Sequence, residues 1–223
     1  ELIHGQFQPQ FNEMLNIIQN SPNIQERITG LEMLKRFTNI FFSTMICYKS
    51  DSNIYGNKRI CDLITRIFDI LLAGMQSDNP ELCHACVNTL LNPLEFFERP
   101  IHFPRQRAAL VQIVLVYLQS PVEAIVLDGY LLARQIIHSY YSLIDDFIPS
   151  LIPFVQQALN SGSDEMKIQA CLLLQGIGDV ESNIHQPEIN AACQSLSETC
   201  GFSGKILESL FIPLVMMICD CPI

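Results

Sequence analysis

The sequence has few basic residues and few residues that break helices. Lysine and arginine total 13 among 223 residues, against 23 aspartates and glutamates, and the formal net charge is −10. This balance argues against a nucleic-acid-binding surface, which needs clustered positive charge. The 10 glycines and 12 prolines are too few for a collagen-like or low-complexity chain. Because 49% of the residues are hydrophobic, the chain can bury a sizeable core.

Membrane spans and secretion signals are also missing from the sequence. The longest apolar runs, 108–118 and 209–219, are shorter than the roughly 20 residues of a membrane helix, so we expect no membrane insertion. The chain shows no secretory leader and no N-glycosylation sequon, and its nine cysteines lie mostly in apolar runs. We therefore expect free thiols in a reducing compartment, the cytosol or the nucleus. Because the chain starts without Met and ends within an apolar run, we expect a fragment of a longer protein.

Strand-like alternation is absent, whereas helical spacing is present almost throughout. Apolar residues recur at i, i+3, i+4 and i+7, for example at positions 11, 14, 15 and 18. Ser or Asn followed by Pro or Gly marks the breaks, and these residues suit the start of a new helix. The breaks at Asn79, Ser120 and Ser161 are 41 residues apart. A period of about 40 residues with two helices per unit is typical of HEAT repeats, so we predict an all-α solenoid of antiparallel helix pairs.

The predicted array is a single domain over 1–223. In each pair, the second helix carries a small residue that would let neighbouring helices approach closely, with an apolar residue four positions later on the same face. These small residues are Gly30, Cys86, Gly129 and Ala170. The predicted segments are repeats over 8–46, 58–97, 105–141 and 147–178, a linker over 179–204 and the start of a fifth repeat over 205–223. Pro93 is expected to bend the second helix of the second repeat.

Candidate chemistry centres on "ELCHACVNTLL", where Cys83, His84 and Cys86 could form half of a zinc site. A structural zinc site needs four ligands, and the other close cysteine pair, Cys219 and Cys221, lies at the far end of the predicted array. We therefore interpret Cys86 as a packing residue and expect His84 to be a buried, neutral histidine with one hydrogen bond. No nucleophile motif or complete phosphate loop is present, and Asp145–Asp146 fits a helix N-terminus. We predict no enzymatic activity, no metal and no cofactor.

The first helices of the predicted pairs are unusually apolar for an outer layer. Residues 108–118 offer only Gln112 as a strongly polar side chain, and residues 147–159 carry no charge. Phe68 and Leu72 lie on one side of the apolar stripe that we assign to the core. Flanking repeats could cover these side chains. Alternatively, shallow slots between adjacent outer helices could hold the aromatic residues of a peptide.

Several segments resemble the N-terminal half of the importin-β (karyopherin-β) nuclear transport receptor family. They are "VNTLLNPLEFF" (87–97), "VQIVLVYLQSP" (111–121), "SYYSLIDDFIPSLIPFVQQAL" (139–159) and "SDEMKIQACLLLQGI" (163–177). The resemblance implies transport between cytoplasm and nucleus, localisation at the nuclear pore, and binding of Phe-Gly nucleoporins on the outer helices. It implies contacts with Ran GTPase, importin-α or cargo mainly through parts outside this fragment. The implied Phe-Gly slot residues are Phe68, Asp69, Leu72, Ala109, Leu110 and Phe147, and the family typically has phenylalanine where this chain has Ala109.

Two other classes of function are compatible with the sequence. A HEAT-repeat scaffold or regulatory subunit of another assembly, such as a phosphatase regulatory subunit, would bind through polar inner ridges and would ignore Phe-Gly peptides. A metal-dependent module would use Cys83, His84 and Cys86.

Overall fold

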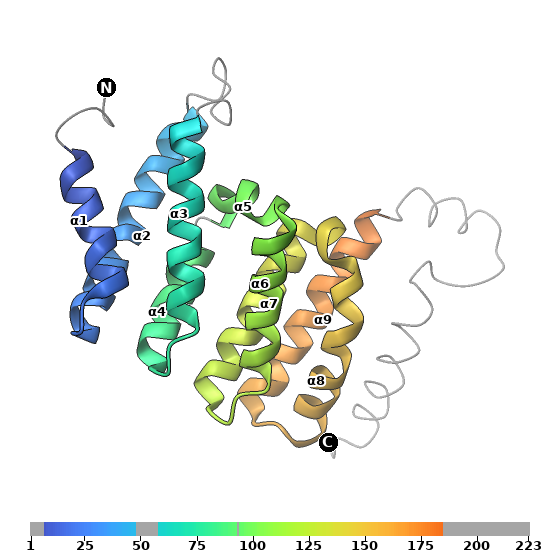
Figure 1. Ribbon diagram of the computed structural model, residues 1–223. Coiled ribbons are helices and arrows are strands. Elements are labelled where there is room, and N and C mark those ends of the chain that lie inside the picture. Colours follow the sequence, from blue (N-terminus) through green and yellow to red (C-terminus); the bar gives the residue numbers. More distant parts are fainter. Residues whose placement is uncertain (1–6, 48–57, 93, 185–223) are drawn as a thin grey trace. The chain divides into compact units, whose positions relative to one another are not determined.

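The computed structural model describes residues 7–47, 58–92 and 94–184, and these form helices and short connections without any strand. By their contacts they belong to two compact units, Glu1–Asp128 and Gly129–Ile223, within which consecutive long helices run antiparallel (Figure 1). The elements are α1 (Phe7–Asn20), α2 (Ile24–Cys47), α3 (Lys58–Met75), α4 (Pro80–Leu91), η2 (Leu94–Phe97), α5 (Glu98–His102), α6 (Pro104–Leu118), α7 (Glu123–Ile144), η3 (Asp145–Phe147), α8 (Ile148–Ser161) and α9 (Asp164–Ile184).

The breaks between helices lie close to where the sequence predicts them. Asn79 caps α4, because its side-chain oxygen accepts a hydrogen bond of 2.9 Å from the Leu82 N–H, and Pro80 opens the helix. At the first break the residues Ser21-Pro22 predict Ser21 as the cap and a helix from residue 22. The cap is instead Asn23, since Asn23 Oδ1 accepts from the Gln25 N–H at 3.0 Å. The helix that follows therefore begins two residues later than predicted. No described helix is both long enough and apolar enough to cross a membrane.

Two predicted helix ends differ from the structure. The second helix of the second repeat, which the sequence predicts over 80–97, ends at Leu91, and a 3-10 turn and α5 follow it. In the segment after this break, the consecutive residues Phe96 and Phe97 are both buried. In the second unit, α9 continues to Ile184 although a linker was predicted from 179, because glycine is tolerated inside a helix. The predicted bend at Pro93 and the segment 185–223 lie outside the described residues.

Paired side chains twelve residues apart set how closely the helices of a pair approach. In the first pair Gly30 faces Ile18, and a Cβ on Gly30 would lie 2.8 Å from the Ile18 side chain. In the next pair the sizes are exchanged, because Gly74 on α3 makes room for the thiol of Cys86 on α4. In the second unit the corresponding residues of α8 and α9 are both alanines, at 158 and 170, and both are buried. The small position predicted from the repeat is thus confirmed as a site of close helix packing in the first unit.

Two buried tyrosines form hydrogen bonds from one helix to the backbone of another. In the first unit, the Tyr117 hydroxyl on α6 donates to the carbonyl of Met75, at the end of α3, at 2.7 Å. In the second unit, the Tyr130 hydroxyl on α7 donates to the carbonyl of Phe154 on α8 at 2.8 Å. Burial raises the pKa of Tyr117 above its usual range and raises that of Tyr130 to about 12. Both phenols therefore remain donors over the whole physiological pH range.

Candidate functional site

Five of the six residues expected to line peptide slots lie on α3 and α6, which pack against each other in the first unit. In the structure, three of them face inward: Phe68 is 0% exposed, Leu110 is 1% exposed and Leu72 is 6% exposed. Asp69 is exposed and Ala109 is half-buried. The structure thus places the apolar slot residues in the packed interior beneath α3 and α6, and leaves Asp69 and Ala109 at the surface.

The burial of Phe68 differs from the outward orientation expected from the sequence. Its ring lies 5.6 Å from the ring of Phe97, centroid to centroid, and Phe97 comes from the 3-10 turn that replaces the end of the predicted helix. Helical spacing assigns Ile64, Ile67 and Leu71 to the core side of α3. Because η2 and α5 also pack against α3, residues beside this stripe are buried as well. The sequence pattern of α3 does not reveal this, because the covering elements follow some 25 residues later in the chain.

The last slot residue, Phe147, belongs to the second unit. It ends η3, immediately before α8, and is 7% exposed. Asp145 and Asp146 form the first turn of η3, both exposed, and Asp145 accepts a hydrogen bond of 2.9 Å from the Asp146 N–H. This arrangement agrees with the expected role of the two carboxylates at a helix N-terminus.

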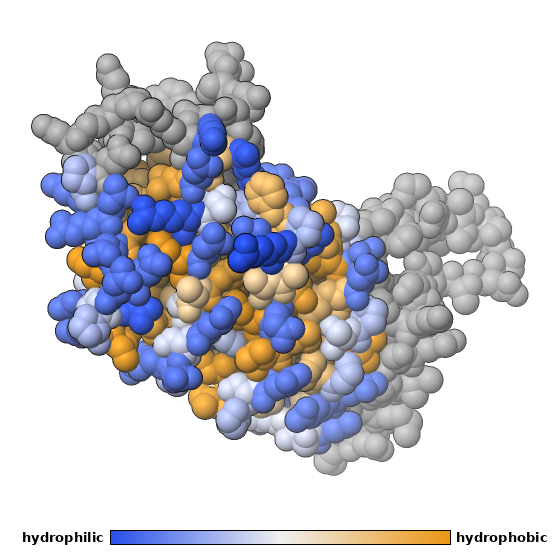
Figure 2. Space-filling model, in the orientation of Figure 1, coloured by the Kyte–Doolittle hydropathy of each residue, from blue (hydrophilic) through white to orange (hydrophobic). Residues whose placement is uncertain are grey.

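Apolar positions do reach the surface beside the predicted slot. Ala73 on α3 and Ala108 and Val116 on α6 are exposed, and sequence reasoning did not single them out because both faces of α6 are apolar. On the face shown in Figure 2, hydrophobic atoms are interspersed with hydrophilic side chains. Such a surface suits small apolar anchors with polar surroundings.

His84 is not the buried histidine that we expected. Its side chain is 58% exposed, and its Nδ1 lies 2.8 and 3.0 Å from the two carboxylate oxygens of Asp128 on α7. The amide of Asn88, one turn along α4, lies 2.8 Å from Nε2. When Nδ1–H donates to Asp128, Nε2 accepts from Asn88, so both ring nitrogens are satisfied. The partner was not predictable because it lies 44 residues away, on a different repeat.

The two nearby cysteines occupy packing positions. The Cys83 thiol donates to the carbonyl of Ser77 at 3.1 Å, and the Cys86 thiol packs against Gly74. Burial raises the pKa of Cys86 to about 12, so this group is a thiol at neutral pH. In the ranges that the structure describes, no three metal-ligating side chains converge, and His84 points to Asp128 instead of toward the cysteines.

Comparison with known proteins gives similarity in structure alone. None of the family models matches the sequence, and neither does any of the curated proteins. Among solved structures, yeast importin-β (Kap95p) matches all of this chain with a TM-score of 0.74 at 16% sequence identity. A structure in which Kap95p binds RanGDP matches with a TM-score of 0.72 at 17% identity, and the Kap95:Nup1 complex with 0.73 at 16% identity.

This chain has the HEAT-repeat solenoid fold. The matches cover 100% of the chain but only 24–25% of the importin-β structures, so the chain spans about a quarter of their length. At this level of identity the likeness establishes the fold of antiparallel helix pairs, and with it the predicted fold class. Within the first unit, α1 packs against α2 and α3 packs against α4.

Proposed function

We propose that this chain is part of a nuclear import receptor similar to importin-β, which binds Phe-Gly nucleoporin repeats on its first helices. The observation that supports this most is the match to importin-β over the whole chain, with a TM-score of 0.74. One of the matched structures is a complex with Nup1, and another is with RanGDP. The receptor would act without enzymatic activity or cofactor, in the cytoplasm, the nucleus and the nuclear pore.

The proposed slot for a phenylalanine ring lies where α3 packs against α6, with buried residues as its floor and surface residues as its rim. Leu72 and Leu110 would form the floor of a slot, Asp69, Ala73 and Ala109 its rim, and Phe147 would contribute in the second unit. Because the floor residues are closed off from solvent, an entering phenylalanine ring must displace packed side chains, which keeps the affinity of one slot low. Several slots and many repeats would together give avidity with fast exchange. Ran, importin-α and cargo would be bound mainly by parts outside this chain.

The test is an NMR titration of the full chain with a Phe-Gly repeat peptide and with a control peptide that has serine in place of phenylalanine. Substitution of the buried Leu72 or Leu110 by aspartate would disturb the core, so a loss of binding could not be assigned to the slot. The variant is therefore Ala73→Glu, on the exposed rim. Its matched control is Ala124→Glu, at another exposed alanine, in the first turn of α7. We expect Ala73→Glu to weaken Phe-Gly binding about fivefold or more, because a carboxylate at the rim would have to be desolvated.

Equal affinities of the wild type, Ala73→Glu and Ala124→Glu would contradict the slot assignment. Absence of any binding that distinguishes the Phe-Gly peptide from the serine control would instead favour the alternative, a HEAT-repeat scaffold or regulatory subunit.

A further inference from the structure

An open pocket of about 490 Å³ lies beside α3, where this helix meets α1 and α5 in the first unit. Its volume is within the range of ligand-binding pockets, roughly 300–1,000 Å³. It adjoins the closed α3–α6 packing, but its lining is different and faces solvent. Its lining includes Cys61, Asp62, Arg66, Asp69, Ile70, Arg99 and Phe103. Of these, only Asp69 was expected at a binding site.

The polar groups of this pocket are balanced in charge and in hydrogen-bonding character. Asp62, Arg66 and Asp69 follow one another at i, i+4 and i+7, on one face of α3. Arg66 Nη1 donates to Asn12 Oδ1 on α1 at 3.1 Å, which holds the guanidinium at the α1 side. Within the part of the chain that the structure describes, neither carboxylate makes a hydrogen bond or ion pair. Arg99 adds a second guanidinium, so two positive charges offset two negative ones.

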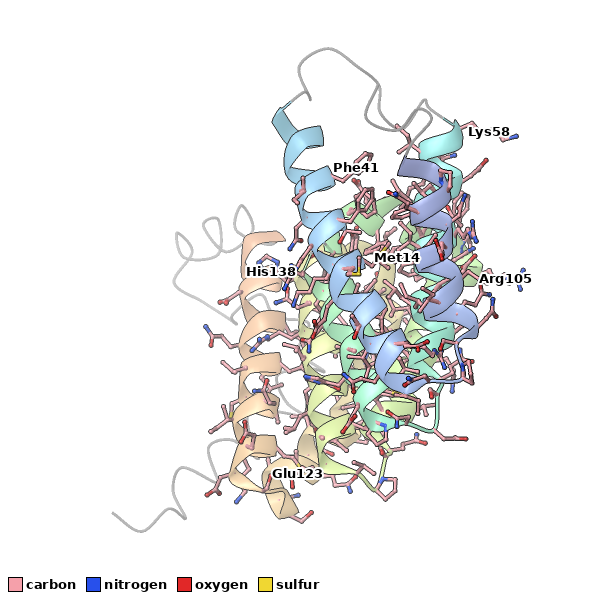
Figure 3. All side chains as sticks on the ribbon, turned by 90° about the vertical axis from the view of Figure 1, so that its left-hand side faces the viewer. Met14, Phe41, Lys58, Arg105, Glu123 and His138 are labelled. Carbon is pink, nitrogen blue, oxygen red and sulfur yellow. The ribbon has the colours of Figure 1, made fainter. Side chains whose placement is uncertain are left out.

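Such a lining favours a ligand that has both donors and acceptors and no net charge. A peptide backbone has this character, since its N–H groups would donate to the carboxylates and its carbonyls would accept from the guanidiniums. A cationic side chain would gain from Asp62 and Asp69 but would be repelled by Arg66 between them. Lys58 and Arg105 extend outward on the side of α1 and α3 in Figure 3, and neither is among the residues that line the pocket.

The apolar part of the pocket is formed around an exposed aromatic ring. Phe103, between α5 and α6, is 45% exposed, and the buried Ile70 and Cys61 lie at the floor. A solvent-exposed ring next to guanidiniums provides a stacking surface for another aromatic ring.

We infer that this pocket binds an uncharged, extended peptide segment through one aromatic side chain, which stacks on Phe103 while its backbone amides lie between Asp69 and the arginines. The choice of peptide class rests on the proposed function, and the pocket adds a docking place for the same peptides. It is open while Leu72 and Leu110 are closed off, so a ring can enter it without displacing core side chains. Arriving peptides therefore engage this pocket before the α3–α6 packing opens.

The experiment titrates the full chain with three acetylated, amidated tripeptides, Gly-Phe-Gly, Gly-Ser-Gly and Gly-Arg-Gly, followed by NMR. The variant is Phe103→Ala, and Val122→Ala is the matched control because Val122 is 42% exposed in the same unit. We expect Gly-Phe-Gly to bind most tightly of the three peptides. Phe103→Ala should weaken its affinity roughly two- to tenfold, as loss of one aromatic pair predicts. Phe103→Tyr should restore the affinity, and Val122→Ala should leave it unchanged.

Stronger binding of Gly-Arg-Gly than of Gly-Phe-Gly, or equal affinity of Phe103→Ala and the wild type, would overturn this inference. A titration with a long Phe-Gly repeat peptide distinguishes failure of this inference from failure of the proposed function. Weakening of that peptide by Ala73→Glu and not by Phe103→Ala would overturn the pocket and leave the proposed function standing. Binding of Gly-Phe-Gly at Phe103, without tighter binding of the longer repeat peptide, would support the pocket and count against multivalent nucleoporin binding.

Discussion

At the scale of single residues, Asp128 is the one charged side chain that the described part of the chain buries. Burial raises its pKa above the ordinary aspartate value, and the hydrogen bond and charge of His84 act in the opposite direction but less strongly. A carboxyl group with a raised pKa binds protons more tightly in the folded than in the unfolded protein. Its ionisation therefore lowers the free energy of unfolding as pH rises through its unfolded and then its folded pKa. His84 limits this cost by donating to the carboxylate.

We predict that Asp128→Asn raises the free energy of unfolding at pH 7 by about 1 kcal/mol, because the amide oxygen still accepts from His84 and no charge is buried. The gain should shrink as the pH falls below the ordinary aspartate range, where the wild-type carboxyl is protonated in both states. His84→Ala should instead destabilise by about 1–3 kcal/mol, since it leaves a buried acceptor unpaired. Urea denaturation of both variants across pH measures these differences. A greater loss from Asp128→Asn than from His84→Ala would contradict this account.

At the scale of helices, complementary side-chain sizes decide how a pair packs. Ile18 with Gly30 and Gly74 with Cys86 place a large and a small residue on opposite members of the two pairs. The combined volume of the two side chains matters more than which helix carries the larger one, because interiors are packed to a constant density. The same logic explains why a cysteine occupies the position of Gly30 in the next repeat without any role in chemistry.

We predict that Gly74→Ala destabilises the protein by about 1–3 kcal/mol, because the added Cβ would collide with the Cys86 thiol. This exceeds the helix-propensity gain of alanine over glycine, up to about 1 kcal/mol. The double variant Gly74→Ala with Cys86→Ala should recover the loss. Gly176→Ala serves as a control, since its Cβ would meet Arg134 at an ordinary 3.5 Å, and it should be neutral or stabilising. Thermal denaturation followed by circular dichroism measures all three, and equal stability of Gly74→Ala and the wild type would refute the packing argument.

At the scale of the whole molecule, the net charge of −10 governs which partners approach. Basic side chains do occur on α3, α5 and α6 of the first unit, at Arg66, Arg99 and Arg105, but Asp62 and Asp69 flank Arg66 on α3. Charges of both signs therefore alternate there, on a chain whose net charge is negative. Neutral peptides are therefore compatible with this surface, whereas polyanions are not.

We predict no binding of single-stranded DNA or RNA to the full chain at about 0.15 M salt, a condition under which phosphate contacts still support binding by basic proteins. Fluorescence anisotropy with a labelled oligonucleotide is the measurement. Saturable binding that weakens steeply as salt is raised would show that the basic side chains form an effective phosphate surface after all.

The sequence by itself determined the all-α fold, the helix pairs and the role of Cys86. Apolar spacing, capping residues and a recurring break are local properties, so they can be found without knowing what packs where. Only the tertiary structure decided that Phe68, Leu72 and Leu110 are buried, that His84 bonds to Asp128 and that the open pocket lies beside Asp69 and Phe103. Each of these depends on segments far apart in the chain, such as η2 covering α3 or α7 meeting α4. Periodicity shows which side of a helix is apolar, but the elements that pack on it decide which apolar side chains remain open to a ligand.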